Sequence, residues 1–315
     1  MKGPLKAVLY FFVNKISGKI INHDSSYTGT IEFSDKIESI NKEKNSDFEN
    51  IIIPGFIDLH CHGGNGFDTM AGISSIKEIS KYHVRHGTTT LLPTTLTASF
   101  DNTINAVDGI DDFIDQNINK TNILGVHLEG PFINPKKLGA QPPFTQLPNI
   151  DFIKKIQKKA NIKVITLAPE LEGAEAFMDY LIENNIRVQI GHSLADYNCC
   201  LKIMNKNNVG FTHLYNAMSG DDHRNPGVVT AALRHAEYAE IICDLHHVDK
   251  ANIHLAEKCI PRLYAITDAI SATGMPDGDY DFSRTKISKK KGRATINSTV
   301  LAGSVINMHD TFKNL

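Results

Sequence analysis

Residues 51–62 read IIIPGFIDLHCH, an apolar run that ends in two histidines. Similar short runs recur along the chain, and stretches with apolar residues at helical spacing, such as Ile76, Ile79 and Tyr82, lie between them. The runs predict eight parallel strands: IIIPGFIDLH (51–60), TTTLLPTTL (88–96), ILGVHLE (123–129), KVITLAP (163–169), RVQIGH (187–192), VGFTHL (209–214), EIICDL (240–245) and RLYAITD (262–268). We therefore predict an α/β fold, a TIM-type (β/α)8 barrel, in which the chemistry lies where the strands end.

An open, doubly wound sheet is the alternative fold for such a pattern. Its nucleotide-binding versions carry a glycine-rich phosphate loop. The sequence has no GxGxxG after the first strand and no GxxxxGK[ST], so this alternative loses its usual support.

The first fifty residues have a different pattern, with the short β-like runs AVLYFFVN, KIINHD and TGTIEFSDKIESI between polar turns. We expect two parts. Residues 1–50 would form a small N-terminal β appendage, part of a β-sandwich, and residues 51–315 would form the barrel.

The composition is that of an ordinary enzyme, with 315 residues, 41% hydrophobic and 22% charged. A net charge of −2 provides no global attraction for nucleic acid or an anionic membrane, so an anionic ligand needs a local cluster. No apolar run approaches the roughly 20 residues that span a bilayer, and the N-terminus shows no convincing cleavage site. The five cysteines lack CxxC spacing, which favours free thiols and a cytoplasmic protein.

Almost every predicted strand ends in a residue that can bind a metal, move a proton or hold an anion. These residues are His60 and His62 on the first strand, Glu129 on the third, His192 on the fifth, His213 on the sixth, Asp244, His246 and His247 on the seventh, and Asp268 on the eighth. Because the carboxyl ends of barrel strands meet at one mouth, we expect these side chains to converge.

His60 and His62 are two residues apart on a strand, so both imidazoles point to one face and can bind one cation. Histidines at strand ends also serve as hydrogen-bonding core residues, which is the alternative role. Glycines follow the pair and let the loop pass close to a ligand. Cys61 lies between the histidines and should point away from them as a packed barrel residue.

Glu129 follows an apolar strand, where a carboxylate is costly to bury without a cation or several donors. Together with His192 and His213 it makes a set of three ligands that leaves room for water, as catalytic metal sites require. The set suits zinc, iron and manganese equally.

Asp268 ends the eighth strand without a basic residue nearby in the sequence. A carboxylate at this place can take a proton from an activated water and deliver it to a leaving amine. The alternative role is a helix N-cap, which Asp fills well.

Beyond these single residues, a series of motifs resembles the N-acetylglucosamine-6-phosphate deacetylase family of the amidohydrolase superfamily. The resemblance runs from about Ile51 to the last residues, and HLEGPF and HLYNAM are its most specific parts. The motifs occur in the family's order: PGFIDLHCHGG, GVHLEGPFINPKKLGAQPP, TLAPE, GHSLADY, THLYNAMSG, RNPGVV, DLHHVD and TDAISATGMPDGDY.

The resemblance implies hydrolysis of the acetamide of N-acetyl-D-glucosamine 6-phosphate to D-glucosamine 6-phosphate and acetate, in amino-sugar catabolism. It implies Asp268 as general base and acid, and a divalent metal (Zn, Fe, Mn or Co) on Glu129, His192 and His213. It also implies a homodimer in which Arg224 or His247 reaches across the interface. The residues implied to bind the phosphorylated amino sugar are Gln141, Asn216, Ala217, Arg224, His247 and Ser304.

This sequence departs from the family pattern at three places. Some members replace the two histidines of the first strand and use one metal, whereas His60 and His62 here allow a second. Gln141 stands where some members carry a histidine, and its amide can still donate to the acetyl carbonyl. Family chains continue for several tens of residues past Ser304, so we expect the last barrel helix and the C-terminal sandwich strands to be missing and the appendage to expose unpaired edges.

Two rival functions remain at this point. Another amidohydrolase, such as a dihydroorotase or an aminoacylase, would usually bridge two metals with a carboxylated lysine on the fourth strand, which here ends in Ala168-Pro169-Glu170. An inactive homologue would act only as a phosphosugar binder or a subunit partner. Metal content and a deacetylation assay separate these.

Overall fold

The computed structural model of the protein describes residues 14–43, 49–116, 121–206, 209–282 and 285–315. The chain divides into two compact units, Met1–Gly55 and Phe56–Leu315. The boundary follows Gly55, five positions beyond the predicted one, because Ile51–Ile52 forms strand β4 and pairs with β1 (Asn14–Ile21).

The N-terminal unit contains one four-stranded sheet in its described part, in the order β3-β2-β1-β4. β2 (Ser26–Phe33) pairs antiparallel with β1 and with β3 (Ile37–Lys42), whereas β4 is parallel to β1. Its few buried apolar side chains include Ile20 and Ile31. The β character predicted for this segment is confirmed, although most of the run AVLYFFVN lies outside the described residues.

The second unit contains the eight predicted barrel strands. They are β5 (Phe56–Cys61), β8 (Thr88–Thr95), β10 (Val126–Glu129), β11 (Ile162–Leu167), β12 (Arg187–Ile190), β13 (Val209–Phe211), β14 (Tyr238–Ile242) and β15 (Arg262–Ile266). Six of them form one parallel sheet in the order β13-β12-β11-β10-β8-β5, to which the short β9 (Asn122–Ile123) adds beside β8, and β14 pairs with β15.

Main-chain hydrogen bonds close the barrel at two seams, the junction of β15 with β5 and that of β13 with β14. The N–H of Asp268 donates to the carbonyl of His60 at 2.9 Å, which joins β15 to β5. The N–H of Leu214 donates to the carbonyl of Glu240 at 2.9 Å, which joins β13 to β14. The TIM-type fold predicted from the strand pattern is therefore confirmed.

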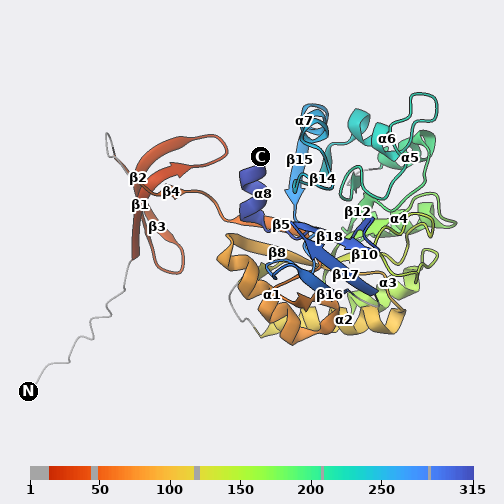
Figure 1. The fold of residues 1–315 in the computed structure, drawn as a ribbon, viewed down its shortest axis with the longest axis horizontal. Helices are drawn as coiled ribbons and strands as arrows, with labels where there is room; N and C mark the ends of the chain where they lie inside the picture. Colours follow the sequence, from red (N-terminus) through yellow and green to blue (C-terminus); the bar gives the residue numbers. More distant parts are fainter. Residues whose placement is uncertain (1–13, 44–48, 117–120, 207–208, 283–284) are drawn as a thin grey trace, which may run out of the picture. The chain divides into compact units, whose positions relative to one another are not determined.

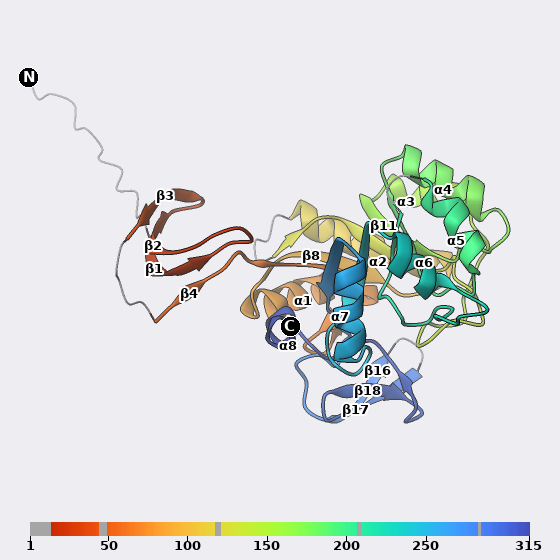
Figure 2. The same ribbon diagram turned by 90° about the horizontal axis from the view of Figure 1, so that it is seen from above.

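Helices surround these strands on the outside (Figures 1 and 2). Polar N-cap side chains accept N–H bonds at several of them, for example Ser99, Asn149 and Asp196. The helices are α1 (Ile73–Arg85), α2 (Phe100–Asp115), α3 (Ile150–Gln157), α4 (Ala174–Glu183), α5 (Tyr197–Met204), α6 (Val228–His235), α7 (Lys250–Cys259) and α8 (Met308–Asn314). No helix within the described ranges is both long and apolar enough to cross a membrane.

Two insertions that the strand pattern did not predict shape the mouth of the barrel. After β5 the chain forms the small hairpin β6 (Gly63–Gly64) and β7 (Phe67–Asp68), followed by the 3-10 helix η1 (Thr69–Ala71). After β15 it forms an antiparallel sheet of β16 (Gly278–Phe282), β17 (Thr285–Lys290), β18 (Arg293–Ile296) and β19 (Val300–Leu301).

The antiparallel sheet β16–β19 lies against the barrel (Figure 2) and shares an apolar cluster with it. Phe282, Ile287 and Ala294 of the sheet belong to one buried cluster with Leu96 and Ile270 of the barrel. Lys291 and Gly292 connect β17 to β18 with φ angles of 50° and 76°, as a tight hairpin turn requires.

All five cysteines are free thiols, as predicted. Cys61 is fully buried, and its Sγ lies 3.3 Å from Nε2 of His83 on α1. Its neighbours His60 and His62 point elsewhere, because successive side chains on a strand alternate.

Phe177 on α4 belongs to the main core, which lies between the strands and helices, and its substitution tests how much this core stabilises the protein. Its side chain is 1% exposed, and its ring lies 4.8 Å from that of Phe132. Phe177→Ala should lower the free energy of unfolding by about 3–5 kcal/mol, because a cavity replaces the ring. Urea unfolding measures this loss. Leu255→Ala, on the exposed side of α7, is the control and should change stability by less than about 0.5 kcal/mol; equal losses would contradict the assigned core.

Candidate active site

Three strands present their functional side chain on a residue in the left-handed backbone region. His192, His213 and Asp268 follow β12, β13 and β15 with φ angles of 48°, 29° and 49°. This conformation is uncommon for residues other than glycine and costs free energy, of order 1–3 kcal/mol each. The sharp turn aims each side chain back into the barrel mouth instead of along the following loop.

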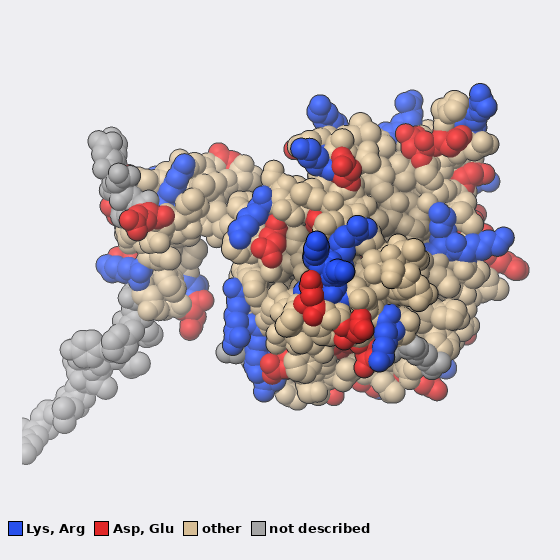
Figure 3. Space-filling model, in the orientation of Figure 1, with Lys and Arg blue, Asp and Glu red and all other residues tan. Residues whose placement is uncertain are grey.

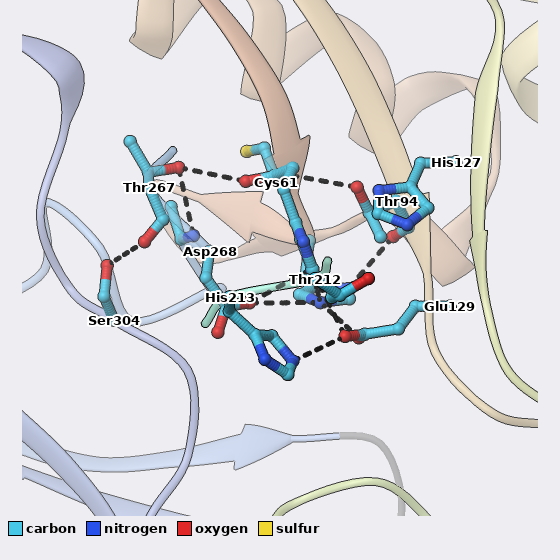
Figure 4. Close-up of polar contacts among 12 residues, drawn as sticks. Cys61, Thr94, His127, Glu129, Thr212, His213, Thr267, Asp268 and Ser304 are labelled. Carbon is cyan, nitrogen blue, oxygen red and sulfur yellow. Dashed lines mark hydrogen bonds and ion pairs between the residues drawn. The ribbon is translucent and has the colours of Figure 1, made fainter. Parts of the chain in front are cut away.

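The first cluster joins the ends of β10, β12 and β13. Oε1 of Glu129 lies 3.2 Å from Nε2 of His192 and 3.0 Å from Nε2 of His213. The two imidazole nitrogens are 3.1 Å apart. The predicted set of Glu129, His192 and His213 therefore converges on one point. Figure 4 shows Glu129 and His213 of this set.

The second cluster shares Glu129 and adds the two histidines of β5. Oε2 of Glu129 lies 3.0 Å from Nε2 of His62, and that nitrogen lies 3.1 Å from Nε2 of His60. Glu129 therefore stands between two pairs of imidazoles, with Oε2 toward His62 and with Oε1, which faces the first cluster, also 3.5 Å from Nε2 of His60.

Asp268 belongs to the side of the second cluster. Its Oδ1 lies 3.2 Å from Nε2 of His62 and 3.5 Å from Nε2 of His60. No helix within the described ranges begins at Asp268, so the N-cap role is excluded. Its carboxylate lines the pocket beside the imidazoles.

The charges of the cluster depend on one another because all its members are buried. Burial lowers the pKa of His62, but contacts with Asp268 and Glu129 outweigh it and raise the pKa to about 9. Burial raises the pKa of Glu129, yet the neighbouring imidazoles hold the net pKa well below its usual range. The carboxylates of Glu129 and Asp268 thus require positive charge beside them.

The donor atoms fit a divalent cation. Nδ1 of His192 faces the carbonyl of Lys137 at 2.7 Å, and Nδ1 of His62 faces that of Thr94 at 3.1 Å. When neutral, these rings donate through Nδ1 and leave the lone pair of Nε2 directed at Glu129. Imidazole lone pairs about 3 Å apart beside a carboxylate suit metal–ligand bonds of about 2.0–2.2 Å.

A pocket opens above the cluster. Besides members of the two clusters, four of the residues predicted to bind substrate line it: Gln141, Asn216, Ala217 and His247. Asp244 orients His247, because its Oδ2 lies 2.7 Å from Nδ1 of that ring. The Gln141 amide donates to Oε2 of Glu129 and accepts the N–H of Thr97, so it is held against the metal-ligand candidates.

Two predicted substrate-binding residues do not line this pocket. Ser304 is 1% exposed, its hydroxyl donates to the carbonyl of Thr267, and its N–H donates to the carbonyl of Asp268 (Figure 4). Its hydroxyl and N–H thus support the Asp268 turn, and its role in binding substrate stays a prediction. Arg224 lies in an exposed loop between Gly220 and Gly227, outside the pocket of its own chain.

The sequence interpretation missed the polar side chains inside the barrel beneath the clusters. Glu240 on β14 is fully buried and lies with Oε2 2.9 Å from Nδ1 of His60. Gln189 on β12 donates to Oε1 of the same carboxylate at 3.1 Å. The sequence does indicate this position of Glu240. Glu240 lies two positions before Ile242 and four before Asp244, so it shares their face of the strand.

His127 on β10 is a third buried polar residue near the clusters. Its Nδ1 lies 3.2 Å from the carbonyl of Leu59 and its Nε2 lies 2.8 Å from the hydroxyl of Thr166. Burial and the nearby charge of His60 lower the pKa of His127 to about 3. It does not line the pocket, so it lies behind the site and not at its mouth.

One wall of the pocket comes from the antiparallel sheet, through Phe282, Val300 and Leu301. Figure 3 shows Lys and Arg side chains gathered on the surface over this sheet. The exposed basic residues are Lys286, Lys290, Lys291 and Arg293. Exposed Asp277, Asp279 and Asp281 lie on or beside the same sheet, so this surface carries both charges.

Comparison with known proteins agrees with this geometry. Residues 51–304 match the model of the amidohydrolase family. The N-acetylglucosamine-6-phosphate deacetylase of Vibrio furnissii is 37% identical over 84% of this chain and 68% of its own length. The N-acetylgalactosamine-6-phosphate deacetylase of Escherichia coli O157:H7 is 34% identical over 84% of this chain and 72% of its own length.

A solved structure gives the same result. The crystal structure of N-acetylglucosamine-6-phosphate deacetylase from Thermotoga maritima superposes with a TM-score of 0.87 at 29% identity, over 96% of this chain and 83% of that one. This chain therefore belongs to the amidohydrolase family, in the branch that contains the N-acetylglucosamine-6-phosphate deacetylases.

Proposed function

We propose that the protein hydrolyses the acetamide of N-acetyl-D-glucosamine 6-phosphate to D-glucosamine 6-phosphate and acetate. The observation that carries the proposal is the position of Glu129 between two imidazole pairs, with Asp268 facing the same pocket. The relatives named above act on phosphorylated N-acetylamino sugars by name, which supports this substrate class.

We propose that Glu129, His192 and His213 would hold one divalent metal, and that His60 and His62 together with Glu129 would hold a second. Zn, Fe, Mn and Co all suit this mixture of imidazole and carboxylate ligands. A bound divalent metal supplies Lewis acidity, which polarises the acetyl carbonyl and lowers the pKa of the attacking water.

Asp268 moves the proton in this proposal. Its carboxylate accepts a proton from the attacking water while the water oxygen bonds to the acetyl carbon. When the C–N bond breaks, Asp268 returns the proton to the amine nitrogen, and acetate leaves. Burial raises the pKa of Asp268 but His62 and His60 outweigh it, so the group is ionised and ready to accept.

The pocket residues hold the sugar phosphate. His247, oriented by Asp244, and Arg224 offer charge-assisted hydrogen bonds to phosphate oxygens. Because Arg224 is exposed and outside the pocket of its own chain, we propose that it acts in the partner's pocket of a homodimer. Asn216 and Ala217 line the same pocket and contact the sugar, and Gln141 faces the acetyl group.

The rival amidohydrolases have less support. A carboxylated lysine on the fourth strand would bridge their metals, but β11 is followed by Ala168, Pro169 and Glu170. Glu129 already stands between the two imidazole pairs. Glu170 is engaged elsewhere, since its Oε1 accepts the N–H of Leu194 at 2.6 Å and the side-chain amide of Asn134 at 2.8 Å.

N-acetyl-D-galactosamine 6-phosphate is the second candidate substrate. The deacetylase from Escherichia coli O157:H7 that carries this sugar in its name is 34% identical to the chain. The two sugars differ only in the orientation of one hydroxyl, so both should be offered to the enzyme.

The reaction would take place in the cytoplasm, where free thiols such as all five here are maintained.

Acetate release tests the function directly. The metal-loaded protein should release acetate from N-acetyl-D-glucosamine 6-phosphate, and parallel assays with the galactosamine epimer rank the two candidates. If folded, metallated protein released no acetate from either sugar, the chain would be a phosphosugar binder or a subunit partner instead.

Asp268→Asn tests the proton transfer. The amide keeps the shape of the carboxylate but cannot accept a proton, and general acid–base catalysis contributes about 10²–10⁴-fold. Because Asp268 acts in both steps, kcat should fall by about 10³–10⁴-fold while the KM changes little. Metal content, measured on the same preparation, serves as the control. A variant that kept more than about a tenth of kcat, far above this range, would remove Asp268 from the proposed role.

Arg224→Ala tests the phosphate contact across the dimer. It should raise KM for the phosphorylated sugar and leave turnover of unphosphorylated N-acetylglucosamine unchanged, since only the phosphate loses a charge-assisted bond. Arg234→Ala removes an exposed positive charge at the end of α6 and is the matched control. Equal losses with both sugars, or equal losses in both variants, would speak against a specific phosphate contact.

A further inference from the structure

We propose that Glu240 is a positioning residue that sets the tautomer of His60 and thereby makes the His60–His62 side of the centre a second metal position. The inference rests on the metal-dependent function proposed above. It concerns a residue beneath the ligand candidates that does not line the pocket.

Glu240 lies in the interior of the barrel with no exposed surface. Its carboxylate contacts four groups that can donate. Nδ1 of His60 lies 2.9 Å from Oε2, and the main-chain N–H of His213 donates to the same oxygen at 3.3 Å. The Gln189 amide donates to Oε1 at 3.1 Å, and the Tyr264 hydroxyl donates to it at 3.4 Å.

This set of contacts decides where the proton of His60 resides. An ionised carboxylate can only accept, so Nδ1 of His60 must carry the hydrogen. In the neutral ring the lone pair then belongs to Nε2, which faces His62, Glu129 and Asp268. A carboxylate behind an imidazole also raises its basicity as a metal ligand.

The contact distinguishes His60 from the other imidazoles. His62 and His192 are oriented by neutral carbonyls, those of Thr94 and Lys137. Nδ1 of His213 has no hydrogen-bond partner in the part of the chain that the structure describes. His60 is thus the one ligand candidate within the described ranges whose Nδ1 faces a carboxylate.

Glu240 also links the two clusters. Its Oε2 contacts His60 of the second cluster and the main chain of His213 of the first. Its own carbonyl accepts the N–H of Leu214 at 2.9 Å, the bond that closes the seam between β13 and β14. One residue therefore contacts ligand candidates from both seams of the barrel.

Further contacts hold the carboxylate rigid. Gln189 donates to Glu240 and accepts the hydroxyl of Thr212 at 3.1 Å, and Thr212 contacts the hydroxyl of Thr166 at 2.7 Å. A buried network of this kind is stable only when its members are satisfied, which fixes the position of each side chain. Glu240 is thus pre-set before any metal binds.

Metal binding to Glu240→Gln provides the test. The variant keeps the shape of the Glu240 side chain. Its amide, however, brings N–H groups of its own among the groups that donate to the carboxylate in the wild type. Competition with a chelator, with Zn²⁺ as the probe, should give two ions per wild-type chain. In the variant the affinity for one ion should fall by about 10- to 100-fold, while the other is retained.

Tyr264→Phe is the matched control for the metal measurement. It removes another hydrogen bond to Glu240 from the same interior but leaves His60 in place, so it should bind two ions as the wild type does. A wild-type chain that bound only one ion, or equal loss of both ions in Glu240→Gln, would overturn the proposal. So would an equal loss of the second ion in Tyr264→Phe.

The tautomer can be read in the wild-type protein even if Glu240→Gln does not fold. Proton-detected NMR of the metal-free protein labelled with ¹⁵N-histidine, at a pH where the ring is neutral, should show a protected Nδ1–H signal from His60 beside those of His62 and His192. His60→Gln should remove that signal. A His60 ring protonated on Nε2 alone would overturn the proposal. Neither the metal count nor the NMR spectrum uses substrate. If wild-type protein did not deacetylate the sugar, the proposed function would be wrong. The role of Glu240 would still be judged from the number of bound ions and the tautomer of His60.

Discussion

The buried carboxylate of Glu129 is the constraint on which the rest of the site depends. It is 1% exposed and lies within 3.0–3.5 Å of Nε2 atoms on His60, His62, His192 and His213. An isolated charge in such a place would be strongly unfavourable. The neighbouring imidazoles remove the penalty when they are protonated, and a bound cation would remove it more completely. The site is therefore organised for positive charge at its centre.

The barrel supplies the rigidity that this arrangement needs. His192, His213 and Asp268 are held in a left-handed backbone conformation that costs free energy, so the surrounding bonds must maintain it. At Asp268 the main chain is bonded on both sides, to His60 on β5 and to Ser304 beyond β19. Ser304, a residue implied to bind substrate, thus also supports this turn. Its hydroxyl and N–H keep the Asp268 turn in place.

Polar groups inside the barrel connect this mouth to its interior. Glu240, Gln189, Thr212 and Thr166 form a continuous path of hydrogen bonds beneath the clusters. Such buried polar groups contribute little to net stability, but they are costly to leave unpaired and so select one arrangement. The orientation of the ligand candidates consequently depends on side chains inside the barrel as well as on the loops at its mouth.

The sequence by itself determined the barrel, because eight apolar runs with helical stretches between them allow few other folds. It also determined that Glu129, His192, His213 and Asp268 would meet, since strand ends in a barrel share one mouth. Only the tertiary structure decided how they meet. His60 and Glu240 lie 180 positions apart, and no periodicity relates them. That Glu129 serves both imidazole pairs, that Ser304 turns inward and that Arg224 stays outside the pocket all depend on side-chain directions and long-range packing. Local sequence patterns carry no information about these.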